Sequence, residues 1–573
     1  MVSAQPESMT DNDDVFNQLS ILELNHHTEL MEQVYAALLR GSYEKYLGNF
    51  NQAIEEYQEG IDIDSTQGIF YQEIAECNYI LGNIDASTTY AIKAIQNDPT
   101  LPRPHLLMGT IYAKDNKTKQ AIKEVSEALA VDSTLEDAEQ LLADQYLREG
   151  DVDNAITHYE NAVKLDPNDV LSHYQLGSLY TQKRDYAQAA EHYQRVTQLS
   201  PRHPLSYINL GWSLELIGKA KEAEKAYLTA ISLDPDNTFV QQRLGVLYLN
   251  RDDYSDASTQ FLKVLDKDPK NTVALEYLGE TYFYAKNYKE GEKCFQKVTS
   301  LKPDYARAQL FLGFLTDAQN NTSDALKYFT KALSDPNESE SMYLQFYAQY
   351  TKVDKLEKGI YYLEQMLPTS ASDWNTDFYL ALCYAALGKN DKALQYYQSG
   401  IAKNPKESDL YFQMGNLYDK MGKTDDAISA MTKAIELNPQ DPEAYNYLGY
   451  MFADKGIRLD EAQKYIEKAL QISPKAGYIV DSLGWVYYKK GMITEALNEL
   501  QQAATLTPDD PVIYEHLGDA YSKKGLLKEA DEAWEKALKL QPDNKDIEKK
   551  LQEVKSKLDK QPEKKSDKTE EMD

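Results

Sequence analysis

Small residues recur along this chain at a nearly constant step of about 34 residues, and this period constrains the fold more than any other feature. One step is longer by a single residue, and Tyr347 is the one large residue in the series. The fifteen positions are Gly41, Ala75, Gly109, Ala143, Gly177, Gly211, Gly245, Gly279, Gly313, Tyr347, Ala381, Gly415, Gly449, Gly484 and Gly518. A unit of this length cannot bury its apolar face alone, so the period predicts a solenoid of about fifteen stacked units.

Each unit has the pattern of two helices. Apolar residues lie three or four positions apart on both sides of the turn, as Leu210 and Leu214 do, which is helical periodicity. Tyr often follows the small residue after three positions, which partly explains 44 Tyr against 14 Phe and 4 Trp. Most units end near a proline such as Pro235, which cannot continue a helix. Each unit is therefore predicted to be helix, turn, helix and proline loop.

Eleven of the fifteen positions hold Gly, although Gly inside a helix costs roughly 1 kcal/mol relative to Ala. A second small residue, usually Ala, follows twelve positions later, as Ala223 follows Gly211. We expect this pair of small residues to allow close approach of the two helix backbones, which would offset the cost of Gly.

These features resemble the tetratricopeptide repeat. A good copy consists of Tyr207, Leu210, Gly211, Ala223, Tyr227, Ala230 and Pro235. The resemblance covers residues 34–544 and implies an all-α, right-handed superhelical solenoid with terminal capping helices. It also implies that the first helix of each unit lines a concave groove in which a protein or peptide binds. The expected function is a non-catalytic scaffold or adaptor for protein–protein interaction.

The predicted organisation follows the quality of the repeats. The unit at 338–373 is weak because Tyr347 replaces the small residue and Pro368 comes early, and we expect its helices to be forced apart and the array to kink there. Phe16, Leu19, Leu22 and Leu24 predict a short N-terminal capping helix, and Ile547, Leu551, Val554 and Leu558 predict a C-terminal one. The predicted segments are a disordered N-terminus with a capping helix at 1–33, repeats 1–9 at 34–337, the weak repeat at 338–373, repeats 11–15 at 374–544, a capping helix at 545–558 and a disordered charged tail at 559–573.

Composition and motifs exclude several functions. The formal net charge of -31 is opposite in sign to that of a nucleic-acid binder. No apolar run reaches the roughly 18 residues of a membrane span. Cys77, Cys294 and Cys383 lie too far apart for metal-ligand spacing, and no phosphate-binding loop or catalytic motif is found. The chain is predicted to be no enzyme and to need no cofactor or metal.

The resemblance places the second, fifth, ninth, twelfth and thirteenth residues of each unit in the groove. Aromatic residues there are candidates for partner binding, although each could instead pack against the neighbouring unit. The strip of Tyr450, Trp485 and Tyr488 is expected to lie beside acidic residues, namely Asp481, Glu515 and Asp519, and to bind an apolar, basic segment. The predicted groove residues are Trp212, Glu215, Phe239, Phe283, Tyr284, Phe314, Phe378, Leu382, Asn416, Tyr450, Trp485 and Tyr488.

The last three units, which include "DSLGWVYYKKGMITEAL", resemble bacterial envelope tetratricopeptide lipoproteins, among them the adaptor of a carboxy-terminal processing protease. This resemblance implies a protease or envelope-complex partner and a periplasmic or envelope location. Neither a signal sequence nor an anchoring cysteine is evident. Val2-Ser3-Ala4 resembles the end of a cleaved signal or is a chance tripeptide. The alternative location is the cytoplasm. The alternative function is that of an accessory subunit of an envelope or glycan-assembly complex.

Overall fold

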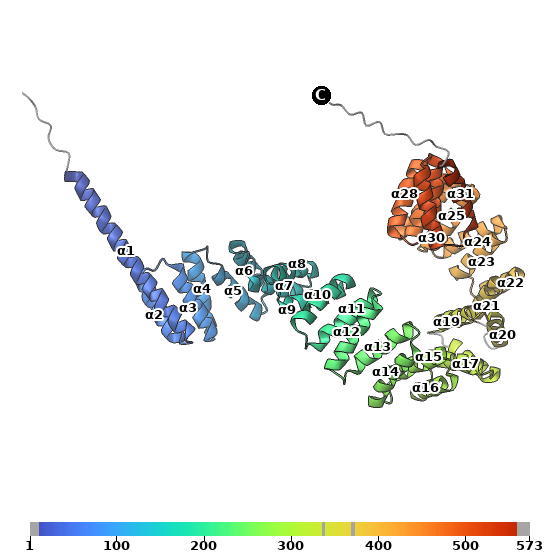
Figure 1. Ribbon diagram of the computed structural model, residues 1–573, viewed down its shortest axis with the longest axis horizontal. Helices are drawn as coiled ribbons and strands as arrows, with labels where there is room; N and C mark the ends of the chain where they lie inside the picture. The colour runs from blue at the N-terminus through green and yellow to red at the C-terminus, as the bar shows by residue number, and fades with distance from the viewer. Residues whose placement is uncertain (1–10, 335–337, 368–372, 559–573) are drawn as a thin grey trace, which may run out of the picture. The chain divides into compact units, whose positions relative to one another are not determined.

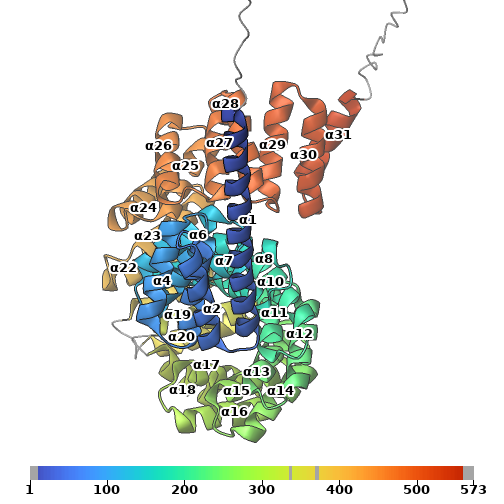
Figure 2. The same ribbon diagram turned by 90° about the vertical axis from the view of Figure 1, so that its left-hand side faces the viewer.

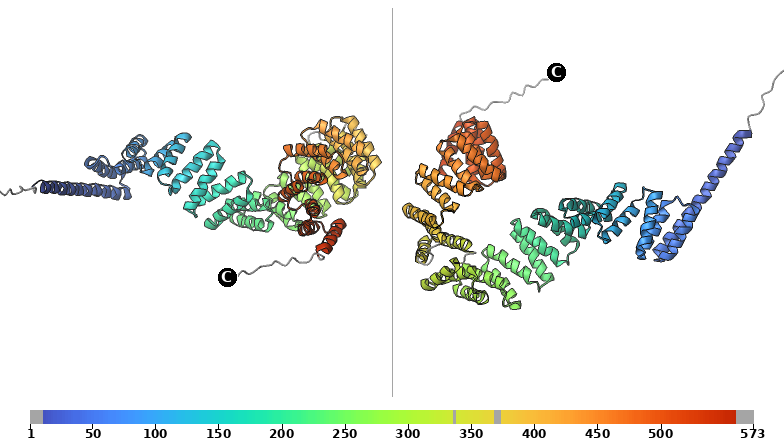
Figure 3. Two further views of the ribbon diagram at one scale, coloured as in Figure 1. Left: turned by 90° about the horizontal axis from the view of Figure 1, so that it is seen from above. Right: turned by 180° about the vertical axis from the view of Figure 1, so that it is seen from behind.

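The structure, a computed structural model, describes residues 11–334, 338–367 and 373–558. Every regular element in these ranges is an α-helix, thirty-one in all. Consecutive helices pair in chain order, and the pairs follow one another within each part of the chain (Figures 1 and 3). The predicted all-α repeat solenoid is confirmed. The predicted charged tail at 559–573 lies outside the described residues.

The chain divides into two compact units, Met1–Ala285 and Lys286–Asp573. The first unit contains α1 (Asp11–Tyr46), α2 (Phe50–Ile63), α3 (Gly68–Ile80), α4 (Ile84–Asn97), α5 (Pro102–Lys114), α6 (Thr118–Val131), α7 (Glu136–Glu149), α8 (Val152–Leu165), α9 (Val170–Gln182), α10 (Tyr186–Leu199), α11 (Pro204–Leu216), α12 (Ala220–Leu233), α13 (Thr238–Asn250), α14 (Tyr254–Lys267) and α15 (Thr272–Tyr284).

The second unit contains α16 (Tyr288–Leu301), α17 (Ala306–Ala318), α18 (Thr322–Leu333), α19 (Ser339–Lys352), α20 (Leu356–Met366), α21 (Trp374–Ala386), α22 (Asn390–Lys403), α23 (Ser408–Lys420), α24 (Thr424–Leu437), α25 (Pro442–Lys455), α26 (Leu459–Ile472), α27 (Gly477–Lys489), α28 (Ile493–Leu506), α29 (Pro511–Lys524), α30 (Leu527–Leu540) and α31 (Lys545–Leu558). Odd-numbered helices up to α29 are the first helices of their repeats, and even-numbered ones are the second helices.

The repeated glycine accommodates a bulky side chain from the second helix of its pair. A Cβ added at Gly211 would lie 2.7 Å from the ring of Tyr227, and one at Gly518 would lie 2.4 Å from Trp534. The expected close approach therefore exists, but it is chiefly a contact between glycine and a side chain of the second helix. The backbone of the paired alanine contributes at some positions, since the Ala462 carbonyl oxygen is 2.9 Å from the same point at Gly449. Several of these rings, such as Tyr227, are fully buried, which accounts for more of the tyrosine excess.

The weak repeat is held by an aromatic cluster instead of a glycine. Phe346 and Tyr350 of α19 pack with Phe329 of α18 and Tyr362 of α20, and their ring centroids lie 4.7–6.3 Å apart. Tyr347 itself is half-buried at this position. The division between the two compact units falls between α15 and α16, and the predicted kink at 338–373 stays a prediction.

The two ends of the array differ. α31 buries Ile547, Leu551 and Val554 in the same core as Trp534 of α30, and it spans the residues predicted as a C-terminal cap. At the other end α1 runs from Asp11 to Tyr46 without a break. The residues expected to form a separate N-terminal cap are thus part of the first helix of the first repeat (Figure 2).

Candidate partner-binding surface

All twelve predicted groove residues lie on first helices, but the structure exposes only two of them. Trp212 on α11 and Phe239 on α13 are exposed, whereas Phe283, Phe314 and Trp485 are buried. The other seven are half-buried, and they are Glu215, Tyr284, Phe378, Leu382, Asn416, Tyr450 and Tyr488.

The aromatic strip predicted near the C-terminus is a packed stack between three first helices. The ring of Trp485 on α27 lies 4.7 Å from Tyr488 on one side and 4.1 Å from His516 of α29 on the other, nearly parallel to both. Tyr450 of α25 meets the same histidine at 6.3 Å. Trp485 therefore packs between neighbouring repeats, whereas Tyr450 and Tyr488 are half-buried, and partner binding by this strip stays a prediction.

The acidic residues expected beside this stack are already paired. Asp481 is buried and its carboxylate lies 2.9 Å from Nδ1 of His516. Glu515 and Asp519 both bind Nζ of Lys550 on α31, at 2.9 Å and 2.8 Å. These carboxylates hold the last repeats and the final helix together, so they do not offer a free acidic surface to a basic partner.

Other predicted groove residues also contact the array itself. Phe314 of α17 packs against Phe329 and Phe346, and Phe378 packs edge-on against Tyr379 and Tyr397. Asn416 accepts a hydrogen bond from the Tyr447 hydroxyl at 3.2 Å. Tyr284 stacks on Tyr254 and meets Phe283 edge-on. Phe314, Asn416 and Tyr284 therefore contact neighbouring repeats, as the alternative interpretation of the pattern allowed, whereas Phe378 packs within its own repeat.

An exposed apolar ladder crosses four neighbouring first helices of the first unit. It consists of the second repeat residue of α9, α11, α13 and α15, so its members recur once in every repeat. The four are Leu171, Leu205, Phe239 and Val273, and each is between 44% and 60% exposed. Sequence reasoning found only Phe239, although the constant repeat period could have found the other three.

Two further exposed apolar residues follow the ladder residue Leu205 after seven and eleven residues of the same helix. Trp212 and Leu216, both on α11, are exposed. Glu215 between them is engaged, because it binds Arg243 of α13 at 2.8 Å and accepts a hydrogen bond from Tyr227 at 2.8 Å. Glu215 and Arg243 therefore neutralise one another and fix α11 against α13, which gives the exposed Trp212 and Leu216 a rigid support.

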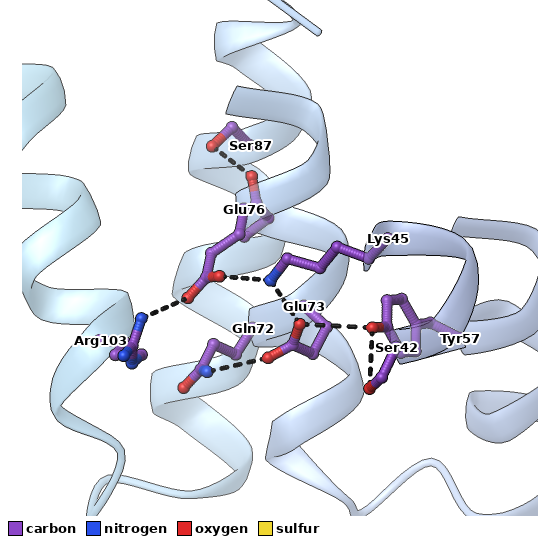
Figure 4. A network of polar contacts seen from close by, with 9 residues as sticks. Ser42, Lys45, Tyr57, Gln72, Glu73, Glu76, Ser87 and Arg103 are labelled. Atoms are coloured by element: carbon purple, nitrogen blue, oxygen red, sulfur yellow. Dashed lines mark hydrogen bonds and ion pairs between the residues drawn. The ribbon is translucent and has the colours of Figure 1, made fainter. Parts of the chain in front are cut away.

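The first helices at the N-terminal end present a paired polar network instead. Lys45 of α1 lies 2.6 Å from both Glu73 and Glu76 of α3, and Tyr57 also donates to Glu73 (Figure 4). Burial alone would lower the pKa of Lys45, but its hydrogen bonds to the two glutamates outweigh that effect and raise the pKa. Arg103 of α5 lies 4.0 Å from Glu76. This network ties α1, α3 and α5 together.

The described residues contain no cluster of His, Cys, Asp and Glu that could hold a metal ion. The three cysteines are buried and unbonded, and burial raises the pKa of the Cys77 thiol to about 11, which makes it a poor nucleophile. Among the described helices none is long and apolar enough to cross a membrane.

Family models match almost the whole array. The model described as the C-terminal domain of cilia and flagella-associated protein 70 matches residues 113–345 and 349–554, and a tetratricopeptide repeat model matches residues 34–67. No curated protein matches the chain in sequence. Neither family model concerns envelope lipoproteins or a protease adaptor, so that resemblance stays a prediction.

Solved structures share the fold at low identity. Naa15/Naa10 bound to HypK is 14% identical with a TM-score of 0.38, over 87% of this chain and 98% of that one. The Cut9 chain of the Cut9–Hcn1 complex is 15% identical with a TM-score of 0.33, over 93% and 98%. Yeast Tom70 is 14% identical with a TM-score of 0.32, over 92% and 96%. These likenesses concern the fold alone.

Proposed function

Because this chain belongs to the family of the cilia and flagella-associated protein 70 C-terminal domain and carries tetratricopeptide repeats, we propose that it is a non-catalytic scaffold. It binds an extended segment of a partner protein along the apolar ladder of α9, α11, α13 and α15. The observation that supports this site is the row of four exposed apolar side chains at one repeat position, with Trp212 and Leu216 beside it. Grouped exposed apolar residues on a soluble protein mark interaction surfaces.

The spacing of the ladder indicates what kind of segment fits it. Packed helices lie about 8–10 Å apart, and the four rungs lie on successive first helices with a second helix between them in the chain, so the rungs are expected to recur at about that distance or slightly more. A polyproline II segment rises about 3.1 Å per residue and presents every third side chain on one face, which gives a repeat of about 9 Å. The partner segment is therefore expected to be extended, with an apolar residue at every third position.

Peptide binding tests this proposal directly. Labelled peptides with an apolar residue at every third position are titrated with the full chain, and fluorescence anisotropy gives Kd. Leu205→Asp with Phe239→Asp should weaken binding at least tenfold, since central apolar anchors are typically worth about 2 kcal/mol each. Peptides of the same composition with the apolar residues shuffled should bind less well.

The matched control replaces two leucines of comparable exposure on second helices. Leu228→Asp with Leu262→Asp, on α12 and α14, adds the same charge away from the ladder and should leave Kd unchanged. The proposal is wrong if the ladder variant binds as tightly as the unmodified chain, or if both double variants lose binding equally while circular dichroism shows both still folded.

The resemblance of the last three repeats to envelope lipoproteins supports a more specific proposal. The partner would then be a carboxy-terminal processing protease with its substrates, in the periplasm or at the envelope. The alternative is that the chain is an accessory subunit of an envelope or glycan-assembly complex. Affinity purification with mass spectrometry separates the two, because a protease and its substrates would be recovered in one case and assembly enzymes in the other.

A further inference from the structure

α1 exposes an apolar stripe on the face that points away from α2. Tyr35, Leu39, Tyr43 and Tyr46 are between 59% and 87% exposed, and their spacing of four, four and three residues places them on one face of the helix. The opposite face is packed: Val34 and Ala37 are buried, and Gly41 lies directly under the ring of Tyr57 from α2.

This stripe lies where another repeat would stack. Every later first helix has a repeat before it in the chain, whereas α1 is at the end of its unit with α2 on one side (Figure 1). Ends of solenoids expose an apolar face that needs a cover, and α31 provides one at the end of the other unit. Within the described residues of the first unit nothing covers the stripe on α1, as the exposure of its side chains shows.

The stripe is symmetric about Leu39. Tyr35 and Tyr43 lie four residues before and after it, and the small residues Ala36 and Ser42 lie three residues before and after it. An antiparallel pair of such helices related by a two-fold axis at Leu39 places each Tyr35 against the partner's Tyr43 and each small residue against the other. This is the self-complementary pattern that an isologous two-fold interface requires.

From this symmetry we propose that α1 pairs with α1 of a second copy of this chain and forms a homodimer through the stripe. The two leucines at position 39 meet on the two-fold axis. The neighbouring cation is not an obstacle, because Arg40 is bound by Glu59 at 3.0 Å and by Glu56 at 2.5 Å on α2. The interface therefore joins largely apolar surfaces of two acidic chains, with the exposed Glu32 of each copy opposite Tyr46 of the other.

The exposed area is of the size that a dimer needs. Tyrosine side chains bury about 150–250 Å² each, so three of them at 59–87% exposure supply roughly 400 Å². Leu39, which is also exposed, brings the stripe to roughly 500 Å². A standard interface buries about 800 Å² on each partner, so the stripe supplies most of it.

Sedimentation equilibrium of the full chain at micromolar concentration tests the proposal. The unmodified chain should have twice the mass of one chain, and Leu39→Glu should have the mass of one chain. Leu262→Glu, which changes a leucine that is 48% exposed on α14, should remain dimeric. A monomeric unmodified chain overturns the proposal and leaves the stripe to a different protein. So does a dimer that Leu39→Glu fails to dissociate.

A cysteine on the proposed axis gives a second measurement that does not depend on dissociation. The native cysteines are buried, so Leu39→Cys supplies the one exposed thiol of the described chain. Mild oxidation should join two copies of Leu39→Cys through a disulfide, because the two positions face each other. Leu262→Cys should stay unlinked under the same conditions. Equal linking of both variants, or of Leu262→Cys alone, overturns the two-fold arrangement.

Discussion

The same repeat position is exposed in one repeat and buried in another. Trp212 and Trp485 each follow directly after the repeated glycine on a first helix, yet Trp212 is 42% exposed and Trp485 only 8%. The two side chains differ in exposed fraction because the repeat that follows each of them places a different side chain beside the indole. In the last repeats His516 lies over the indole at 4.1 Å, whereas α13 presents Arg243 to Glu215 and leaves the indole of Trp212 uncovered.

This contrast predicts opposite effects of the same substitution. Trp485→Ala should destabilise the last repeats by about 3–5 kcal/mol, the usual cost of truncating a large buried aromatic side chain. Trp212→Ala should leave stability nearly unchanged and instead weaken peptide binding. Thermal unfolding followed by circular dichroism measures the first effect and fluorescence anisotropy the second. If Trp485→Ala melts like the unmodified chain, the stack does not hold these repeats together.

At the scale of the element, one buried carboxylate joins the weak repeat to the repeat before it. Asp317 of α17 is buried and binds Lys358 of α20 at 2.6 Å. It also accepts hydrogen bonds from the hydroxyls of Tyr350 at 3.0 Å and Tyr362. A single side chain thereby connects α17, α19 and α20, so the weak repeat depends on the repeat before it.

Removing this carboxylate should therefore release the weak repeat. Asp317→Ala removes the carboxylate that Lys358, Tyr350 and Tyr362 share, and breaking a buried pair in this way costs about 3–5 kcal/mol. Hydrogen exchange should become faster in α19 and α20 and stay unchanged in α23 to α30.

The control for this variant is Asp324→Ala. Asp324 forms an exposed ion pair with Lys327 at 2.8 Å, and exposed pairs contribute little, so exchange rates should not change. Equal protection of α19 and α20 in both variants would contradict the proposed role of Asp317.

At the scale of the whole molecule, the many buried tyrosines should lower the stability of the array at alkaline pH. Burial raises the pKa of Tyr57, Tyr248, Tyr379 and Tyr450 to about 12, above the value of about 10 for an unfolded chain. Between these values the unfolded chain loses protons that the folded chain keeps. The free energy of unfolding must therefore fall as the pH rises.

Stability should thus be fully retained below about pH 10, where tyrosine is protonated in both states, and should be lost progressively towards pH 12. Urea unfolding at a series of alkaline pH values measures this loss. Ultraviolet titration of the folded chain should show these four tyrosines ionising at higher pH than tyrosine in the unfolded chain. A stability that is constant from pH 9 to about pH 12 would contradict this prediction.

The sequence by itself determined the repeat, the two helices of each unit and the position of the tight helix contact. These follow from local information, because the repeat period, the helical periodicity and residues such as Gly211 and Pro235 can be read within one unit or between adjacent ones. The sequence also allowed two predictions about the candidate site. It placed the groove residues on first helices, and the constant period could have added Leu205 and Val273 to Phe239.

Only the tertiary structure decided which of those side chains are exposed. Exposure on a first helix depends on side chains that come from the repeats before and after it, as His516 over Trp485 and Phe346 against Phe314 show. The partner of the repeated glycine was likewise decided by packing, since Tyr227 reaches Gly211 from the second helix. The period of a solenoid can be read from the sequence of its units, whereas the exposure of its surface side chains depends on the contacts between units.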